Sequence, residues 1–237
     1  MFSWTQEMVS FMQTAAERTE YYPKLAQILA QRLIGVRHIC DAGCGIGSLS
    51  LELAKSFDLV TAVDRSPEAM AALRHSVWEK GILNIRCVET DLTECAPEIR
   101  FDAMVFCFFG RTERILPIAK KLCTGRIAIV KKNYCYHRFS LEKHRLSDET
   151  ADDCQGVLEK QGIPFLREDH VFECGQPFES IEQAVRFFSI YDRGEANRRT
   201  EQAVREQLVC TDDSAFPFYL PKKKEIGILI LNAEDLP

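Results

Sequence analysis

The chain has 237 residues, a length that suits one large domain or two small ones and leaves ample chain to bury a core. Apolar residues make up 46% and charged residues 27%, which excludes a disordered chain, a collagen-like repeat and a small disulfide-stapled scaffold. The net charge of −5 provides no overall attraction to nucleic acid or to an anionic membrane.

Strand and helix patterns alternate through residues 36–132. Strands are expected at 36–41, 58–64, 85–90, 101–108 and 126–131, and helices at 48–57, 66–80 and 112–122. The strand segments are continuous apolar runs, which are typical of parallel strands covered on both faces. This alternation predicts an open, doubly wound parallel sheet.

Further elements flank the predicted sheet. Residues 3–33 are expected to be helical, with a break at Tyr22-Pro23, and residues 133–147 form a polar, aromatic and basic stretch. Beyond it we expect a helix at 148–161, a strand at 165–174, helices at 180–191 and 195–208, and a last strand at 225–231. No repeat, low-complexity tract or linker interrupts these elements, so a single domain with helical additions is favoured.

Ten cysteines are spread along the chain, and no CxxC pair occurs. Structural zinc and iron–sulfur sites need ligands at short spacing, so no metal site is predicted. The N-terminal segment lacks the pattern of a secretory signal, and no apolar stretch is long enough to span a bilayer. The cysteines are therefore interpreted as reduced, mostly buried thiols of a cytoplasmic protein.

The segment from Cys40 to Ser48 leaves the first strand and enters a helix. Its glycines, Gly43, Gly45 and Gly47, allow a tight turn and a close approach of the backbone to a ligand below a helix N-terminus. Ser48 stands where a dinucleotide-binding turn requires Gly or Ala, and the Gly-Lys-Ser/Thr of a Walker loop is absent. The glycine turn alone is therefore a weak signal.

Three acidic residues make this signal more specific. Asp64 ends the second strand, where a carboxylate can accept both hydroxyls of a ribose. Asp91 follows the third strand and is placed to accept from an exocyclic amine. Asp41 lies on the glycine turn and suits an ammonium group better than a pyrophosphate. Together they describe a pocket for an adenosine with a charged amino-acid tail.

With these motifs, the chain resembles a class I S-adenosylmethionine-dependent methyltransferase over residues 36–132. The resemblance implies an α/β fold with a seven-stranded, doubly wound, mostly parallel sheet whose last strand is antiparallel. That strand would be 225–231, inserted beside the fifth strand and paired with 165–174. The implied cofactor is S-adenosyl-L-methionine, with S-adenosyl-L-homocysteine as product. The implied cofactor-binding residues are Asp41, Gly43, Cys44, Gly45, Gly47, Asp64, Arg65, Asp91, Leu92, Cys107 and Tyr22.

The resemblance also divides the single domain (1–237) into a helical cap at 1–35, a cofactor-binding core at 36–132 and a substrate side at 133–237. The loop after the fourth strand, Cys107 to Arg111, lacks the Asn/Asp-Pro-Pro-aromatic signature of amino-group methyltransferases and the paired glutamates of protein arginine methyltransferases. No Pro-Cys dipeptide is present for cytosine C5 methylation. Three macromolecular subclasses are therefore disfavoured.

Residues 126–146 are the predicted substrate side. Six cations oppose one Glu142 there, with aromatic residues interleaved: Arg126, Lys131, Lys132, Arg138, Lys143 and Arg145. Such a stretch could bind an anionic small molecule or a phosphate backbone. His137, Tyr134 and Tyr136 are the candidate catalytic or acceptor-positioning residues, and packing or a surface position is the alternative for each.

The leading hypothesis is methyl transfer to a small-molecule acceptor that is anionic or aromatic. An RNA methyltransferase using residues 126–146 and a non-catalytic cofactor-binding module are the alternatives. No membrane partner is expected, and nucleic acid is disfavoured without being excluded. The acceptor, the general base and the oligomeric state are left open by the sequence.

Overall fold

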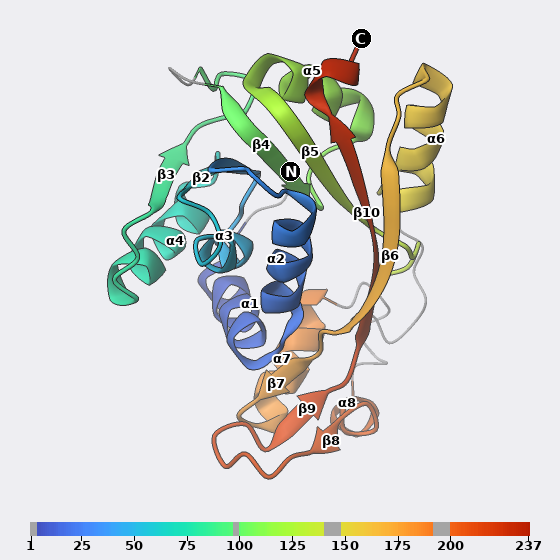
Figure 1. Ribbon diagram of the computed structural model, residues 1–237. Helices are drawn as coiled ribbons and strands as arrows, with labels where there is room; N and C mark the ends of the chain where they lie inside the picture. The colour runs from blue at the N-terminus through green and yellow to red at the C-terminus, as the bar shows by residue number, and fades with distance from the viewer. Residues whose placement is uncertain (1–3, 97–99, 140–147, 192–199) are drawn as a thin grey trace.

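The computed structural model describes residues 4–96, 100–139, 148–191 and 200–237. Its main feature is a seven-stranded sheet with the order β3-β2-β1-β4-β5-β10-β6 (Figure 1). The strands are β1 His38–Ala42, β2 Leu59–Asp64, β3 Ile85–Glu89, β4 Phe101–Cys107, β5 Cys123–Lys132, β6 Leu166–Glu173 and β10 Lys223–Asn232. Strand β10 runs antiparallel to both β5 and β6, whereas β1 to β5 pair in parallel. The predicted class I methyltransferase fold is confirmed, including the place of its last strand.

Helices cover both faces of this sheet (Figure 1). Helices α2 (Tyr21–Arg32) and α3 (Ser48–Leu53) pack on one face, where Val60 and Val105 point. Helix α4 (Pro67–Glu79) packs on Ala62 of the same face. Helices α5 (Thr112–Leu122) and α6 (Ala151–Gln161) pack on the other face, against residues such as Met104 and Ile129.

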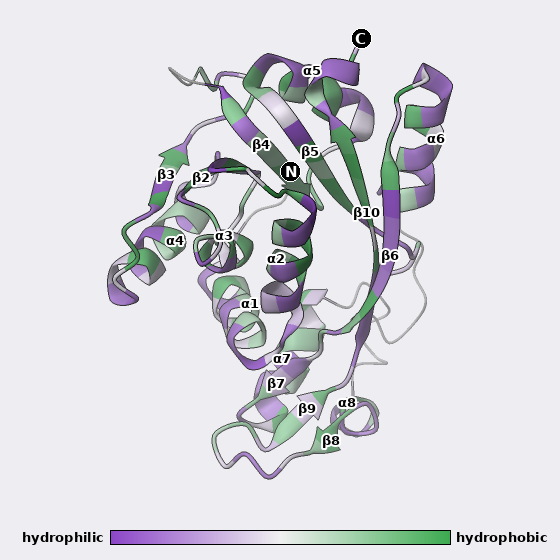
Figure 2. Cartoon of the chain, viewed as in Figure 1, coloured by the Kyte–Doolittle hydropathy of each residue, from purple (hydrophilic) through white to green (hydrophobic). Residues whose placement is uncertain are grey.

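The apolar runs read from the sequence are explained by this two-sided burial. Successive residues of a strand point to opposite faces, so a strand with helices on both faces must be apolar at every position. In β5, the last six residues, from Ile127 to Lys132, are all buried. Figure 2 shows β10 as a largely hydrophobic strand beside the mixed edge strand β6.

A second, smaller core packs the N-terminal helix against the segment between β6 and β10. It contains α1 (Gln6–Arg18), a three-stranded antiparallel sheet in the order β7-β9-β8, and helix α7 (Ile181–Tyr191). The strands are β7 Gln176–Phe178, β8 Val209–Cys210 and β9 Phe218–Leu220, and α8 spans Glu201–Arg205. The ring of Phe11 packs edge-to-face with Phe187 at 5.1 Å and with Phe178 at 6.2 Å. None of these three strands was predicted, because strands of two or three residues are too short to show a period.

Two predicted helix boundaries are corrected by the structure. The break in the N-terminal segment lies at residues 19–20 instead of Tyr22-Pro23, and Pro23 sits in the first turn of α2. A proline is tolerated there because the first N–H groups of a helix have no partner within the helix. The helix predicted at 195–208 is observed only as Glu201–Arg205, begun by the cap of Thr200, and residues 195–199 lie outside the described residues.

None of the helices in the described ranges is long and apolar enough to cross a membrane. The division of the single domain into a cap, a core and a substrate side stays a prediction.

Candidate functional site

The glycine turn between β1 and α3 depends on backbone angles that favour glycine. Gly43, Gly45 and Gly47 have φ values of +71°, +55° and +76°. The N–H groups of Gly43 and Cys44 donate to the carbonyl of Val63 at 2.8 and 3.0 Å, which holds the turn against the end of β2. Side chains at such positive φ values are strained, so glycine is required by the conformation itself.

We expect Gly47→Ala to destabilise the protein. A Cβ atom at Gly47 would lie 2.2 Å from the Leu73 side chain, in addition to the strain of the positive φ. The two effects together should lower the free energy of unfolding by about 2–4 kcal/mol in urea denaturation. The matched control is Gly156→Ala in α6, where a Cβ atom meets nothing within 4 Å. That change should stabilise the protein by about 0.5–1 kcal/mol, because alanine is the better helix former. Equal effects at the two positions would contradict this account.

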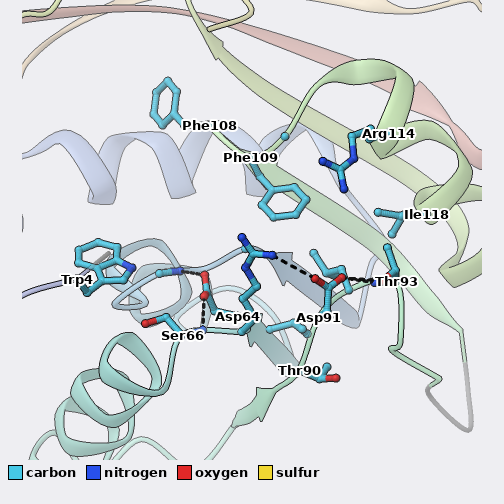
Figure 3. Close-up of a pocket in the computed structure, with 16 residues that line it drawn as sticks. Trp4, Asp64, Ser66, Thr90, Asp91, Thr93, Phe108, Phe109, Arg114 and Ile118 are labelled. Carbon is cyan, nitrogen blue, oxygen red and sulfur yellow. Dashed lines mark hydrogen bonds and ion pairs between the residues drawn. The ribbon is translucent and has the colours of Figure 1, made fainter. Parts of the chain in front are cut away.

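Two carboxylates lie at the ends of the adjacent strands β2 and β3 (Figure 3). Asp64 accepts hydrogen bonds from the backbone N–H groups of Gly45 and Ser66, both at 2.9 Å. Asp91 accepts from the backbone N–H and the hydroxyl of Thr93 at 2.9 and 2.7 Å, and these bonds lower the pKa of Asp91. Asp64 therefore links the glycine turn to the start of α4, and both carboxylates are held in fixed orientations.

These carboxylates lie in a cleft of about 400 Å³. Figure 3 shows the rings of Phe108 and Phe109 on the side of the cleft opposite Asp64 and Asp91. The Phe109 ring packs so closely on Gly43 that a Cβ atom there would lie 2.0 Å from it. Trp4 covers the turn from another side, since a Cβ atom at Gly45 would lie 3.0 Å from its ring.

Six of the predicted cofactor-binding residues line this cleft: Gly43, Gly45, Asp64, Arg65, Asp91 and Leu92. The guanidinium of Arg65 lies 3.5 Å from the Asp91 carboxylate, so the two residues form one charged pair on the cleft wall. Sequence reasoning missed several other residues that line the cleft: Trp4, Val63, Ser66, Thr90, Thr93, Arg114 and Ile118. Four of them flank the predicted pairs Asp64-Arg65 and Asp91-Leu92 in the chain, so their place beside the motifs was a usable signal. The other three, Trp4, Arg114 and Ile118, come from two distant segments that carry no motif.

The other five predicted cofactor-binding residues do not line the cleft. The Cys44 thiol points to the sulfur of Met70 at 3.8 Å, because the turn directs this side chain toward α4. Gly47 packs against the Leu73 side chain. Tyr22 packs on Tyr21, with ring centroids 4.8 Å apart. The remaining two, Asp41 and Cys107, lie behind the cleft wall in β1 and β4.

Asp41 is a buried carboxylate on the first strand. The Ser50 hydroxyl donates to it at 2.6 Å, and no cation pairs with it in the part of the chain that the structure describes. Burial raises the pKa of Asp41 to about 6, against the opposing effect of the Ser50 hydrogen bond. An uncompensated carboxylate at this depth favours a positively charged ligand group close to it.

The predicted basic surface at 126–146 is not continuous. Arg126 lies at the beginning of β5, where its guanidinium donates to the carbonyl of Arg32, far along the strand from the cleft. Lys131 and Lys132 are buried and paired with Glu149 and Asp148, each at 2.9 Å. Lys143, Arg145 and Glu142 lie outside the described residues. Among the described cations of this stretch, Arg126 and Arg138 donate to backbone carbonyls and form no ion pair with a carboxylate, and of these two only Arg138 follows the carboxyl end of β5.

The three candidate catalytic residues are not brought to one point. The His137 ring stacks on Tyr191 of α7 at 6.3 Å, so it belongs to the small second core. Tyr134 and Tyr136 are neighbours with ring centroids 5.6 Å apart. Tyr134 is largely buried beside Arg138, and burial raises its pKa, whereas Tyr136 is exposed. Their catalytic roles stay a prediction.

Lys131 has a role in the cleft that its sequence position did not reveal. Its ammonium donates to the carbonyl of Phe109 at 3.2 Å and to that of Gly110, and it pairs with Glu149. Glu149 in turn accepts from the N–H and the hydroxyl of Thr112, both at 2.8 Å. This buried ion pair fixes the loop after β4 that carries Phe108 and Phe109.

All ten cysteines are unpaired thiols, and eight of them are buried or half-buried. The exceptions are Cys135 and Cys210, which are exposed. No group of three or more His, Cys, Asp or Glu side chains is arranged to hold a metal ion within the described ranges.

Comparison with known proteins finds a family match for the part of the chain that surrounds the cleft. Residues 39–122 match a family model described as a methyltransferase domain, and this segment contains the glycine turn, Asp64 and Asp91. Together with the sheet order, this match confirms the resemblance read from the sequence. Residues 39–122 match a methyltransferase domain on a fold of the class I type. This domain accounts for β1 to β4 and α3 to α5, the elements that surround the cleft.

A curated relative and two solved structures were compared with the chain. A Geobacillus sp. (strain WCH70) protein named as a methyltransferase is 38% identical over 74 residues, which are 31% of this chain and 30% of that protein's length. Magnesium protoporphyrin IX methyltransferase from Synechocystis PCC 6803, solved with bound SAH, has a TM-score of 0.52 at 13% identity, covering 97% of this chain and 89% of that one.

Precorrin 8W decarboxylase from Methanobacterium thermoautotrophicum has a TM-score of 0.51 at 19% identity, covering 88% of this chain and 89% of that one. At these identities the structural likenesses show the fold alone. The same fold carries proteins named for methyl transfer and for decarboxylation, so the reaction has to be argued from the residues of the cleft.

Proposed function

We propose that the protein binds S-adenosyl-L-methionine and transfers its methyl group to a small-molecule acceptor with an anionic or aromatic group. The observation that carries this proposal is the arrangement of the glycine turn, Asp64 and Asp91 around one cleft of a methyltransferase domain. Ligands of doubly wound sheets bind at the carboxyl ends of the strands, and β1, β2 and β3 all end at this cleft.

The residues around the cleft fit such a cofactor. Asp64 offers a fixed carboxylate to ribose hydroxyls, and Asp91 with Leu92 offers an acceptor and an apolar surface to an adenine ring. The amino-acid tail would lie against the glycine turn, where the rings of Phe109 and Trp4 pack and would have to move aside. The unpaired Asp41 carboxylate behind it would gain a positive partner from the ammonium and sulfonium groups of the cofactor.

The bound cofactor supplies an already activated methyl group, so the protein has to align an acceptor and exclude water. Phe108 and Phe109 form an apolar wall for this purpose, and the Lys131–Glu149 pair holds that wall in place. No general base is required if the acceptor atom is already anionic.

Calorimetric titration with S-adenosyl-L-methionine and S-adenosyl-L-homocysteine tests the binding step. We expect both to bind at one site. Assays for formation of S-adenosyl-L-homocysteine with pooled small-molecule acids and phenols then test turnover. Failure of both ligands to bind would overturn the proposal, and binding without turnover on any acceptor would favour the non-catalytic module.

The ionisation of Asp41 should make cofactor binding depend on pH. Its carboxyl group has a pKa of about 6 in the free protein, and a cationic ligand favours the ionised form. The affinity for S-adenosyl-L-homocysteine should therefore fall as the pH drops below about 6, because the proton must leave before the ammonium can pair. Asp41→Asn should bind more weakly at pH 7.5 and lose this dependence. An affinity that stays constant between pH 7.5 and 5 in the wild type would argue against a role for Asp41.

No observation favours RNA as the acceptor. Of the described cations predicted to form a continuous basic surface, Lys131 and Lys132 are paired with carboxylates and Arg126 lies at the opposite edge of the sheet, which leaves Arg138 without a row of neighbouring cations from this stretch.

A further inference from the structure

Three cationic side chains gather at the carboxyl edge of the sheet, next to the cleft: Arg138, Lys222 and Lys224. Arg138 follows β5 in the chain, and the two lysines lie at the start of β10, which is paired with β5. Burial lowers the pKa of Lys222, and the positive charge of Arg138 lowers it further. The same two causes lower the pKa of Lys224 to about 8. Arg138 therefore repels both lysines in a partly buried place.

Lys224 is enclosed by aromatic rings. Its ammonium lies 4.2 Å from the centre of the Tyr21 ring and 4.1 Å from that of Phe108. Such cation–π contacts stabilise a lysine without neutralising its charge. None of the described carboxylates forms an ion pair with Lys224, Lys222 or Arg138.

The cluster also holds hydrogen-bond donors that lack acceptors. One terminal nitrogen of Arg138, Nη2, donates to the carbonyl of Cys174 at 2.7 Å, but the other, Nη1, is buried without a bond of hydrogen-bond geometry, although the Tyr134 hydroxyl lies beside the guanidinium. The Tyr21 side chain is fully buried, and its hydroxyl lies beside the Cys107 thiol without a bond of hydrogen-bond geometry. Buried polar groups are normally paired, so these two donors indicate a missing acceptor.

Phe108 connects the cluster to the cleft. Its ring contacts Lys224, and the same residue lines the cofactor cleft. Phe108 has a φ of +54°, and it is the one residue other than glycine with positive φ in the part of the chain that the structure describes. Strain of this kind persists only where surrounding contacts hold it and gathers at ligand sites. The cation cluster is thus continuous with the place where a methyl acceptor must lie.

We propose that Arg138, Lys222 and Lys224 form a subsite for an oxyanion, a carboxylate or phosphate group of the methyl acceptor. An oxyanion offsets the repulsion among the three cations and gives acceptors to the Arg138 guanidinium and the Tyr21 hydroxyl. The role of this anion as part of an acceptor rests on the proposed function, whereas the binding of the anion itself does not.

Calorimetric titration with three related probes tests the subsite: benzoate, phenyl phosphate and the neutral benzamide. We expect at least one of the anions to bind about tenfold or more tightly than benzamide, because only a charged oxygen compensates the cations. The preferred anion distinguishes a carboxylate from a phosphate site. Equal affinity for all three probes would overturn the proposal.

Two variants and a matched control locate the binding. Lys224→Met and Arg138→Gln keep most of the side-chain volume, and each should weaken binding of the preferred anion about tenfold. Lys223→Met, the neighbouring residue on β10 with an exposed side chain, should leave that affinity unchanged. Circular dichroism checks that the variants are folded, and Lys222→Met replaces any variant that is not. Anion affinity that is equal in the folded variants and the wild type would contradict the assignment.

A pH titration adds a readout that a purely structural lysine would not produce. The groups that face Lys224 are Tyr21, Phe108, Cys107, Cys174 and Arg138. Anion affinity in the wild type should fall as the pH rises through about 8, where Lys224 loses its proton, and Lys224→Met should abolish this fall.

Binding of S-adenosyl-L-homocysteine, measured in parallel, separates the two proposals. Anion binding without cofactor binding would overturn the proposed function and leave the anion subsite standing. Cofactor binding with no preference for the anionic probes would overturn the anion subsite and leave the proposed function standing.

Discussion

Replacing Asp64 with alanine should weaken the binding of S-adenosyl-L-homocysteine by about a hundredfold or more. The wild-type carboxylate accepts from Gly45 and Ser66 and so fixes the glycine turn against the start of α4. Each hydrogen bond to a charged group contributes about 1.5–3 kcal/mol, and the variant also loses the proposed bonds to the ribose. Calorimetric titration at pH 7.5 measures the change directly.

Two further variants make this result specific. Asp58→Ala removes a carboxylate just before the same strand, where Asp58 is exposed and paired with Arg37 at 2.7 Å. It should bind the cofactor as the wild type does. Asp64→Asn retains an acceptor oxygen without the charge. Its affinity for S-adenosyl-L-homocysteine should lie between those of the wild type and Asp64→Ala. An Asp64→Ala variant that binds like Asp58→Ala would remove the central support of the proposed function.

The second large effect is expected from Lys131→Met. Lys131 and Glu149 have side-chain exposures of 3% and 9%, so removing one charge leaves the other buried without a partner. Breaking a buried pair in this way costs about 3–5 kcal/mol of the free energy of unfolding. Because Lys131 also holds the carbonyls of Phe109 and Gly110, cofactor binding should weaken together with stability. Urea denaturation and calorimetric titration check the two effects.

The next residue along β5 provides the matched control. Lys132 pairs with Asp148 at the same distance, but the side chain of Asp148 is 71% exposed. Water can solvate that carboxylate when the lysine is lost. Lys132→Met should therefore lower the free energy of unfolding by only about 1 kcal/mol. Equal losses at the two positions would show that burial of the carboxylate partner does not set the effect.

The cleft and the cation cluster together describe a two-part site. The glycine turn, Asp64 and Asp91 offer one set of contacts at the ends of β1, β2 and β3. In the proposed anion subsite, Arg138, Lys222 and Lys224 would offer another beyond Phe108, after the end of β5 and around the start of β10. The three cations are different residues from those of the glycine turn, Asp64 and Asp91. The two proposals can therefore be tested independently.

Much of the cofactor side could be predicted from the sequence because its signals are local. Gly43, Gly45 and Gly47 lie within five residues of chain, and their positive φ values restrict the residue type. Asp64 and Asp91 end apolar runs whose parallel pairing brings them to one edge. The sheet order followed from the family resemblance together with the same alternation of strands and helices.

The contacts that the sequence did not show join distant segments. Lys131 and Lys132 were placed on a basic surface, but Glu149 and Asp148 pair with them. His137 was grouped with two tyrosines nearby in the chain, but the packing of α7 draws it to Tyr191. The sequence shows which residues are charged or aromatic. Which partner neutralises or stacks on each of them depends on the tertiary fold.

By itself, then, the sequence determined the class of fold, the glycine turn and the acidic strand ends, since each depends on backbone geometry and on the period of apolar residues over a short span. Only the tertiary structure decided which cations stay unpaired. Lys224 comes to Arg138, Tyr21 and Phe108 because β10 inserts antiparallel beside β5, a pairing of segments that are remote in the chain. Burial and charge balance are properties of that assembled edge, so of the proposed anion subsite only Arg138 lay in a stretch that the sequence had pointed to.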